Sequence, residues 1–192
     1  MNKNIRKYSV VVIGSSAGGL NVLSEILSRL KKDFPVPIVI VQHLHPSSDD
    51  YFVKHLERIT SLSVSEAEEK ESLKPGHVYI APPNYHLYIE EDETFSLSAD
   101  EKVNYSRPSI DVLFESAAEL YKEKTVGVIL TGANSDGTKG AKLIKEYGGI
   151  VIVQNPNSAF SSVMPKSVIT NCQTDYILEP EAIVEILNQL SH

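Results

Sequence analysis

Three short polar stretches each follow a run of β-branched residues, and each contains a side chain suited to hydrolytic chemistry. The first has the pattern Gly14-x-Ser16-x-Gly18. The second contains His43 and the third contains Asp136. Glycines at this spacing let the chain turn sharply from a strand into a helix, which leaves the middle serine exposed as in a nucleophile elbow. Because ligands bind beyond the carboxyl ends of the strands in an open parallel sheet, we expect these three side chains to meet in one crevice.

The three residue types have complementary acid–base roles. A serine hydroxyl is a poor nucleophile until a base removes its proton, and the neutral imidazole of His43 can do this near neutral pH. A carboxylate on the other ring nitrogen fixes the tautomer and stabilises the imidazolium. The sequence therefore predicts a catalytic triad of Ser16, His43 and Asp136. Backbone N–H groups at Ala17 and His43 are candidate donors to the oxyanion, because N–H groups at such turns bind negative charge.

Neighbouring residues compete for these roles. Ser15 is a rival nucleophile, although it lies off the centre of the elbow, and His45 is a rival base. His43 and His45 form a possible metal-binding pair, but no third ligand has suitable spacing. The single cysteine, Cys172, excludes an intrachain disulfide framework and a cysteine-based zinc cluster. We therefore expect neither a metal nor an organic cofactor.

The glycine-rich turn also permits two other functions. Such a turn after a first strand is typical of phosphate-binding loops, so a non-enzymatic nucleotide- or anion-binding module is one alternative. Against it, the dinucleotide fingerprint requires glycine where this chain has Ser16 and an acid where it has Gln42-His43. A P-loop requires Lys-Ser/Thr where this chain has Leu20-Asn21. The other alternative is a serine hydrolase that acts on a different ester or amide.

The elements that must position these residues alternate between strands and helices. This order predicts an α/β fold with a doubly wound, mainly parallel sheet flanked by helices. The expected strands cover 9–13, 38–41, 125–130, 150–153 and 176–178. The segment 63–100 differs, because 85–90 and 94–98 alternate around an acidic tip and predict an antiparallel hairpin near one edge. We expect this segment to be an antiparallel appendage within a single domain that covers 1–192.

Composition limits the partners and the cellular location. The 192 residues carry a formal charge of −7 and are 42% apolar, a balance typical of globular proteins. An acidic chain without a basic run is poorly suited to nucleic acid or to an anionic membrane surface. Its apolar runs are far shorter than the ~20 residues that span a bilayer, and the first of them is too short for a signal peptide. These features predict a cytoplasmic protein without direct membrane insertion.

Several separated motifs, in order, resemble the catalytic domain of the bacterial chemotaxis protein-glutamate methylesterases, the CheB family. The resemblance runs from about Val10 to Leu187, nearly the whole chain. The motifs are VIGSSAGG (12–19), QH (42–43), YIAP (79–82), RPSIDVLF (107–114), LTG (130–132), SDG (135–137) and MP (164–165).

The resemblance implies hydrolysis of glutamate γ-methyl esters on the cytoplasmic domains of methyl-accepting chemoreceptors, and often deamidation of receptor glutamines. The nucleophile, histidine and aspartate of the family fall on Ser16, His43 and Asp136. Many members have methionine at Ala133, where the backbone or side chain lines the site, so Ala133 joins the candidate oxyanion donors. Many also have threonine where this chain has Ala17. If that hydroxyl positions the histidine or the oxyanion in the family, this contribution is missing here.

The phospho-receiver domain that usually precedes this catalytic domain is absent from the 192 residues. Two expectations follow. One is a free-standing esterase that a separate regulatory protein controls, and the other is a catalytic domain cut from a longer protein.

Overall fold

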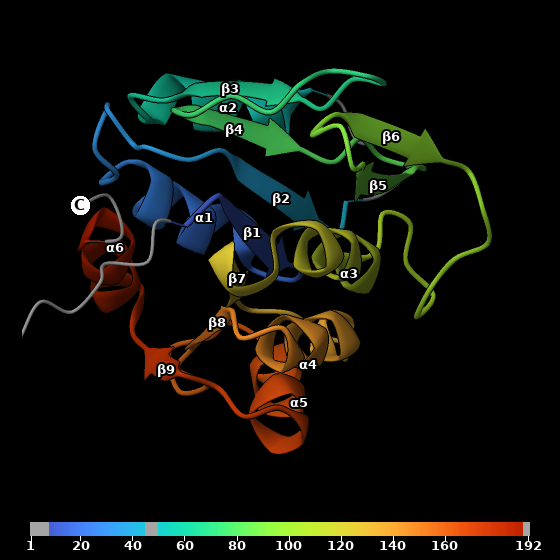
Figure 1. Cartoon of the computed structure of the whole chain (residues 1–192). Coiled ribbons are helices and arrows are strands. Elements are labelled where there is room, and N and C mark those ends of the chain that lie inside the picture. The colour runs from blue at the N-terminus through green and yellow to red at the C-terminus, as the bar shows by residue number, and fades with distance from the viewer. Residues whose placement is uncertain (1–7, 45–49, 190–192) are drawn as a thin grey trace, which may run out of the picture.

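The computed structural model describes residues 8–44 and 50–189. Within these ranges, seven strands form one parallel sheet in the order β3-β4-β2-β1-β7-β8-β9 (Figure 1). The strands are β1 (Val10–Ser15), β2 (Ile38–Gln42), β3 (Ser63–Glu66), β4 (His77–Ile80), β7 (Thr125–Ile129), β8 (Ile150–Gln154) and β9 (Tyr176–Leu178). All neighbouring pairs run parallel, which confirms the doubly wound α/β class.

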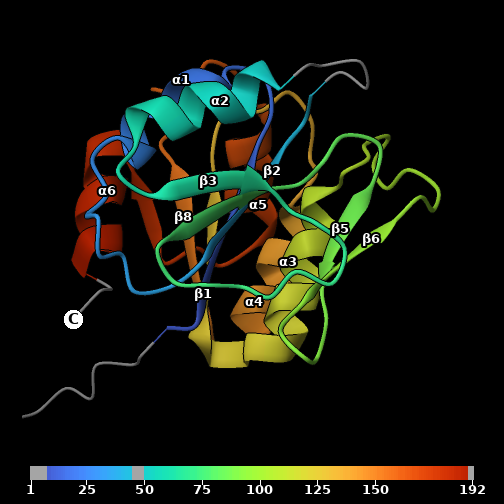
Figure 2. The same cartoon turned by 90° about the horizontal axis from the view of Figure 1, so that it is seen from above.

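Helices cover both faces of the sheet. They are α1 (Gly19–Leu27), α2 (Tyr51–Ile59), α3 (Ile110–Tyr121), α4 (Thr138–Glu146), α5 (Val163–Asn171) and α6 (Pro180–Gln189), with a 3-10 turn η1 (Lys122–Lys124) after α3. One apolar core joins α1, α2 and α6 to one face of the sheet. A second core joins α3, α4 and α5 to the other face. Figure 2 shows α1 and α2 on one side of the strands and α3 and α4 on the other.

The central strands are apolar because both of their faces are covered. Every residue of β1, β2 and β7 is buried. Strands buried on both faces have continuous β-branched runs instead of an alternating pattern, which explains why sequence alone located them. The sheet order also puts β1 between β2 and β7, where the chain changes direction across the sheet. This switch point is where open α/β sheets bind their ligands.

The segment 63–100 differs in part from the expected antiparallel appendage. Its first half supplies β3 and β4, which pair parallel with each other and with β2 as an extension of the main sheet. Only β5 (His86–Ile89) and β6 (Phe95–Ser98) form the expected antiparallel hairpin, and it is a separate two-stranded sheet. The short polar strand β3 was hidden in sequence because only Val64 of its four residues is buried. Pairing at the edge of an existing sheet therefore decides its conformation.

Within the described ranges, every helix falls short of the length and apolar character that a membrane crossing requires.

Candidate active site

The first strand ends in a tight turn that presents Ser16. The N–H of Ser16 donates to the carbonyl of Thr131 at 2.9 Å, which ties this turn to the end of β7. Gly18 has φ +82°, a left-handed conformation that favours glycine, and α1 begins at the next residue. Ser16 is therefore partly exposed at the carboxyl edge of the sheet, as the elbow pattern predicts.

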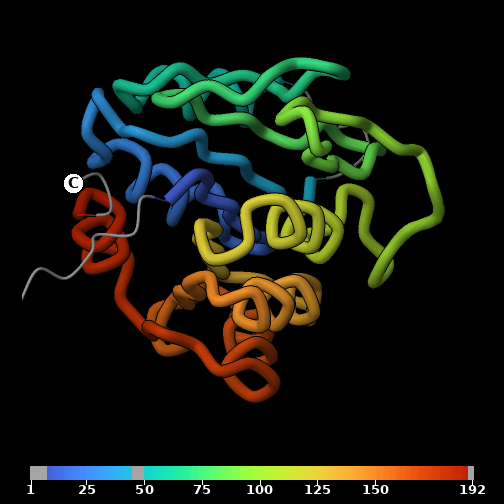
Figure 3. The backbone as a smooth tube through the Cα atoms, viewed as in Figure 1, coloured from blue at the N-terminus to red at the C-terminus, as the bar shows by residue number. Residues whose placement is uncertain are grey.

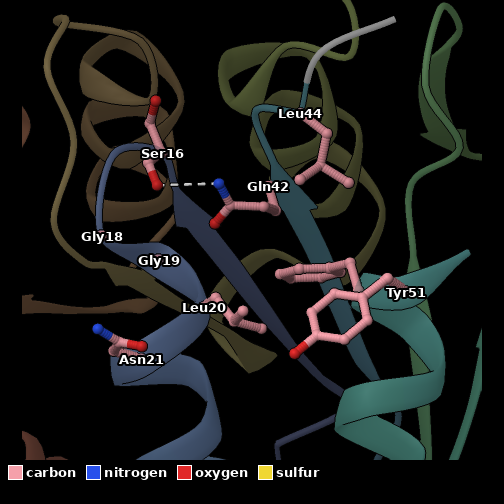
Figure 4. Close-up of a pocket in the computed structure, with 9 residues that line it drawn as sticks. Ser16, Gly18, Gly19, Leu20, Asn21, Gln42, Leu44 and Tyr51 are labelled. Carbon is pink, nitrogen blue, oxygen red and sulfur yellow. Dashed lines mark hydrogen bonds between the residues drawn. The ribbon is translucent and has the colours of Figure 1, made fainter. Parts of the chain in front are cut away.

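Ser15 is not available as the rival nucleophile. Its side chain is fully buried, and its hydroxyl donates to Gln42 Oε1 at 2.7 Å. The amide nitrogen of Gln42 in turn donates to the carbonyl oxygen of Ser16 at 2.9 Å (Figure 4). It also donates to the carbonyl oxygen of His43 at 3.0 Å. The two adjacent serines thus have different functions, because Ser15 fixes the strand end and Ser16 faces the crevice.

His43 and Asp136 are hydrogen-bonded to each other although 93 residues separate them. His43 Nε2 lies 2.9 Å from Asp136 Oδ2, and the Asp136 side chain is fully buried. Since Nε2 donates to the carboxylate, Nδ1 is the ring nitrogen that remains to accept a proton. The histidine is partly exposed and lines a cavity at this edge of the sheet.

Asp136 lies at the N-terminus of α3. Its Oδ2 accepts the N–H of Ile110 at 2.7 Å as well as the His43 bond, and Oδ1 accepts four further donors. Those four are Asn104 Nδ2, Ser109 Oγ and the N–H groups of Asp111 and Gly137. Burial raises the pKa of Asp136, but the hydrogen bonds from His43, Ile110 and Asn104, together with the electrostatic attraction of His43, hold that pKa below its usual value. Asp136 is therefore ionised and held in one orientation.

Ser16 and His43 are neighbours across two parallel strands. Ser15 pairs with Gln42 at the end of the β1–β2 register, so Ser16 and His43 are the first residues beyond the two strand ends. Within residues 8–44 and 50–189, no hydrogen bond joins the Ser16 hydroxyl to the imidazole. Hydrogen bonds of a catalytic serine are often long in the absence of substrate, and a side-chain rotation changes the direction of the hydroxyl.

The expected oxyanion donors differ in availability. The N–H of His43 already donates to the carbonyl of Ser15 at 3.1 Å, so the sheet occupies this donor. The N–H groups of Ala17 and Ala133 have no protein acceptor within the described part of the chain, and both residues are at least partly exposed. Only these two candidates therefore have an N–H free to bind an anion.

Two cavities flank the strand ends. One, of about 310 Å³, is lined by Ser16, Gln42, Leu44 and Tyr51 among others, and Figure 4 shows these side chains around it. The other, of about 180 Å³, is lined by His43 and by residues of the loop between β6 and α3. Because one cavity includes Ser16 and the other includes His43, a substrate that bridges them would pass over both of these candidate side chains.

The remaining histidines of the sequence do not join this site where the structure describes them. His86 is buried, accepting the N–H of Ser109 and lying 3.0 Å from the carbonyl of Glu101. His77 contacts the hydroxyl of Ser65 in the neighbouring strand. His45, the rival base and possible metal ligand, lies outside the described residues. Among the described residues, no group of three or more metal-ligating side chains is assembled.

Sequence reasoning missed the side chains that hold Asp136 in place. Ser109 precedes α3 and resembles an ordinary helix cap, but its hydroxyl donates to Asp136 at 2.8 Å. Asn104 lies in a loop without a recognisable pattern, and only the fold brings its amide to the same carboxylate. For Ser109, a polar residue directly before a helix is a weak signal in the sequence. For Asn104, no local signal exists.

Comparisons with known proteins agree with this geometry. The family model of the CheB methylesterases matches residues 11–187. A protein of Leptospira interrogans, provisionally named protein-glutamate methylesterase/protein-glutamine glutaminase, is 54% identical, with 95% of each chain covered. A Thermotoga maritima protein with the same name is 44% identical over 93% of this chain, and the match spans 54% of that protein's length. The crystal structure of the Thermotoga maritima CheB methylesterase catalytic domain superposes with a TM-score of 0.92, covering 95% of this chain and 98% of that one.

The parallel sheet with a serine elbow and a histidine–aspartate pair at its switch point defines an α/β enzyme of the ester-hydrolase class. Within that class, the chain belongs to the CheB methylesterase family. This membership favours the esterase over the nucleotide-binding alternative that the glycine-rich turn left open.

Proposed function

We propose that the protein hydrolyses γ-methyl esters of glutamyl side chains in proteins, with Ser16, His43 and Asp136 as its catalytic triad. One observation carries the assignment of residues. The His43–Asp136 hydrogen bond lies at the strand end next to the Ser16 elbow. The names of the relatives supply the substrate class, since both are protein-glutamate methylesterases by name.

The reaction proceeds in two halves. The Ser16 hydroxyl oxygen bonds to the ester carbonyl carbon while His43 Nδ1 takes the hydroxyl proton. The negative charge on the carbonyl oxygen is stabilised by backbone N–H groups at Ala17 and Ala133. The intermediate collapses, His43 gives the proton to the departing methoxide, and methanol leaves a glutamyl ester on Ser16. Water then attacks with the same base, which releases the glutamate side chain and restores the serine.

Asp136 acts through His43. Its negative charge stabilises the imidazolium that forms in each half of the reaction, and the bond to Nε2 keeps Nδ1 directed at the serine. Six donors to one carboxylate hold that charge in place before the substrate arrives, so little reorganisation accompanies the reaction.

The same residues can hydrolyse a primary amide, in which ammonia takes the place of methanol as the leaving group. We propose deamidation of glutamine as a second activity, because both relatives also have protein-glutamine glutaminase in their names. Methyl-accepting chemoreceptor domains as the substrate, a cytoplasmic location and control by a separate regulatory protein are further parts of this proposal.

The test is methanol release from a methyl-labelled chemoreceptor cytoplasmic domain. Ser16→Ala should lower kcat by several orders of magnitude, since it removes the only atom that forms the covalent intermediate. Ser15→Ala is the matched control, because it changes the adjacent serine that hydrogen-bonds within the fold. Addition of a chelator should leave the rate unchanged. Wild-type rates in Ser16→Ala would refute the mechanism, and activity on small aryl esters alone would refute the substrate class.

A further inference from the structure

Asn104, in the loop between β6 and α3, contacts two buried carboxylates at once. Its amide nitrogen donates to Asp111 Oδ2 at 2.7 Å and to Asp136 Oδ1 at 3.1 Å. Asp111 is 2% exposed, and its other oxygen accepts the N–H of Gly140 at 2.9 Å. A side-chain amide has two N–H donors and no charge, so it can join two carboxylates that would otherwise repel each other.

The pKa of Asp111 shows that the two carboxylates repel each other. Burial raises the pKa of Asp111, and the charge of Asp136 raises it further. The N–H of Gly140 and the amide of Asn104 act in the opposite direction. Asn104 is therefore the one side chain that faces both carboxylates as a donor in the described part of the chain, and it offsets their repulsion.

The backbone at this position has an unusual conformation. Asn104 has φ +50° and Tyr105 has φ +63°, both in the left-handed region, where asparagine is several-fold enriched among residues other than glycine. The turn directs Tyr105 outward, with 97% of it exposed. Figure 3 shows this loop extending away from the sheet before the chain returns to α3. Tyr105 and its neighbours Ser106 and Arg107 line the cavity of about 180 Å³ beside His43.

We propose that Asn104 is a positioning residue of the active site. Its amide holds Asp136 against Asp111, which fixes the carboxylate that orients His43. The same contact anchors the loop that forms one wall of the substrate crevice. The inference rests on the proposed function, because it assigns a role in orienting the triad.

Asn104→Gly tests the amide apart from the backbone. Glycine adopts the left-handed conformation without steric cost, so this variant removes the donor and keeps the turn. We expect kcat to fall roughly tenfold, as for loss of one hydrogen bond to a charged group, with KM within about twofold of wild type. Lys70→Gly is the matched control, since Lys70 also has a positive φ of 63° but lies in the exposed loop before β4. That variant should keep the wild-type kcat.

Asn104→Asp tests the charge. Aspartate has the same shape and tolerates the same backbone conformation, but it places a third acidic group where a donor stood. We expect a larger loss of kcat than in Asn104→Gly. The proton NMR signal of the His43 ring N–H that is bonded to Asp136 should also shift or broaden in both variants, a readout that loop stability alone would not change.

Ser16→Ala is measured beside them so that the two hypotheses can be separated. If Ser16→Ala is inactive while both Asn104 variants keep the wild-type kcat, the positioning role is refuted and the triad stands. The positioning role is also refuted if both variants lose the same share of kcat, if that loss follows the fall in their melting temperatures, and if the His43 ring N–H signal is unchanged. Activity in Ser16→Ala would instead refute the function on which the role rests.

Discussion

Replacement of Asp136 by asparagine should destabilise the fold as well as abolish catalysis. The carboxylate is fully buried and accepts six hydrogen bonds, two on Oδ2 and four on Oδ1. Asparagine has one acceptor oxygen and one donor NH₂ group. If its NH₂ group replaces Oδ1, that group faces four donors. If it replaces Oδ2, it faces the N–H of Ile110 and Nε2 of His43, and a neutral imidazole can change tautomer so that Nε2 accepts.

The size of the effect follows from these contacts. In the less costly orientation the NH₂ group replaces Oδ2. His43 Nε2 then accepts from it after the change of tautomer, and the N–H of Ile110, 2.7 Å from Oδ2 in the wild type, is the donor left unsatisfied. A buried donor without a partner costs about 1–3 kcal/mol, so the free energy of unfolding should fall by roughly the same 1–3 kcal/mol. This is a large part of the total for a domain, which is typically about 5–15 kcal/mol.

Urea unfolding followed by circular dichroism measures this change. Ser109→Ala is the control, because it removes one donor and leaves five to the same carboxylate. It should cost no more than about 1.5 kcal/mol, the net value of an ordinary hydrogen bond. An Asp136→Asn variant within about 0.5 kcal/mol of wild type would show that the carboxylate is not the common acceptor that the geometry indicates.

The difference in unfolding free energy between wild type and Asp136→Asn should also depend on pH, in a defined direction. The pKa of folded Asp136 lies below the unfolded value of about 3.9. Ionised Asp136 therefore adds stability at pH values above the unfolded pKa, and this contribution is lost as the pH falls through the lowered folded pKa. The stability gap between wild type and Asp136→Asn should accordingly be largest at neutral pH and shrink below about pH 3.9.

Two further predictions concern the elbow and the single cysteine. A Cβ at Gly19 would lie 1.8 Å from Gln42 Oε1 and 2.9 Å from Ser15 Oγ, so Gly19→Ala should displace the Gln42 side chain. Because this displacement shifts the strand end that carries the site, kcat/KM should fall at least tenfold. Wild-type kinetics in that variant would show that the Gln42 network does not shape the site. Burial raises the pKa of Cys172, so the native protein should react with Ellman's reagent far more slowly than the unfolded chain. Equal rates would contradict its burial.

Local patterns were sufficient to predict the central strands and to select the candidate catalytic residues. Strands β1, β2 and β7 are buried on both faces, and such strands have continuous apolar runs that end where polar site residues begin. The elbow pattern also distinguished Ser16 from Ser15, and the structure gives the physical reason, since Ser15 hydrogen-bonds to Gln42. The motifs of the CheB family made the same selection.

Other features depend on contacts between distant parts of the chain. Strand β3 has a polar sequence, and only pairing with β4 makes it a strand. The N–H of His43 was a candidate oxyanion donor until the strand register joined it to Ser15.

The sequence by itself determined the fold class, the family and the three candidate catalytic residues, because periodicity and motif spacing are local properties. Only the tertiary structure decided how Asp136 is held. Its donors come from the β6–α3 loop, from the start of α3 and from the end of β2, and the sequence carries no pattern that relates these segments. Hydrogen bonds form between whatever groups the packed chain brings within reach, so the orientation of the carboxylate is a property of the packing and not of any segment alone.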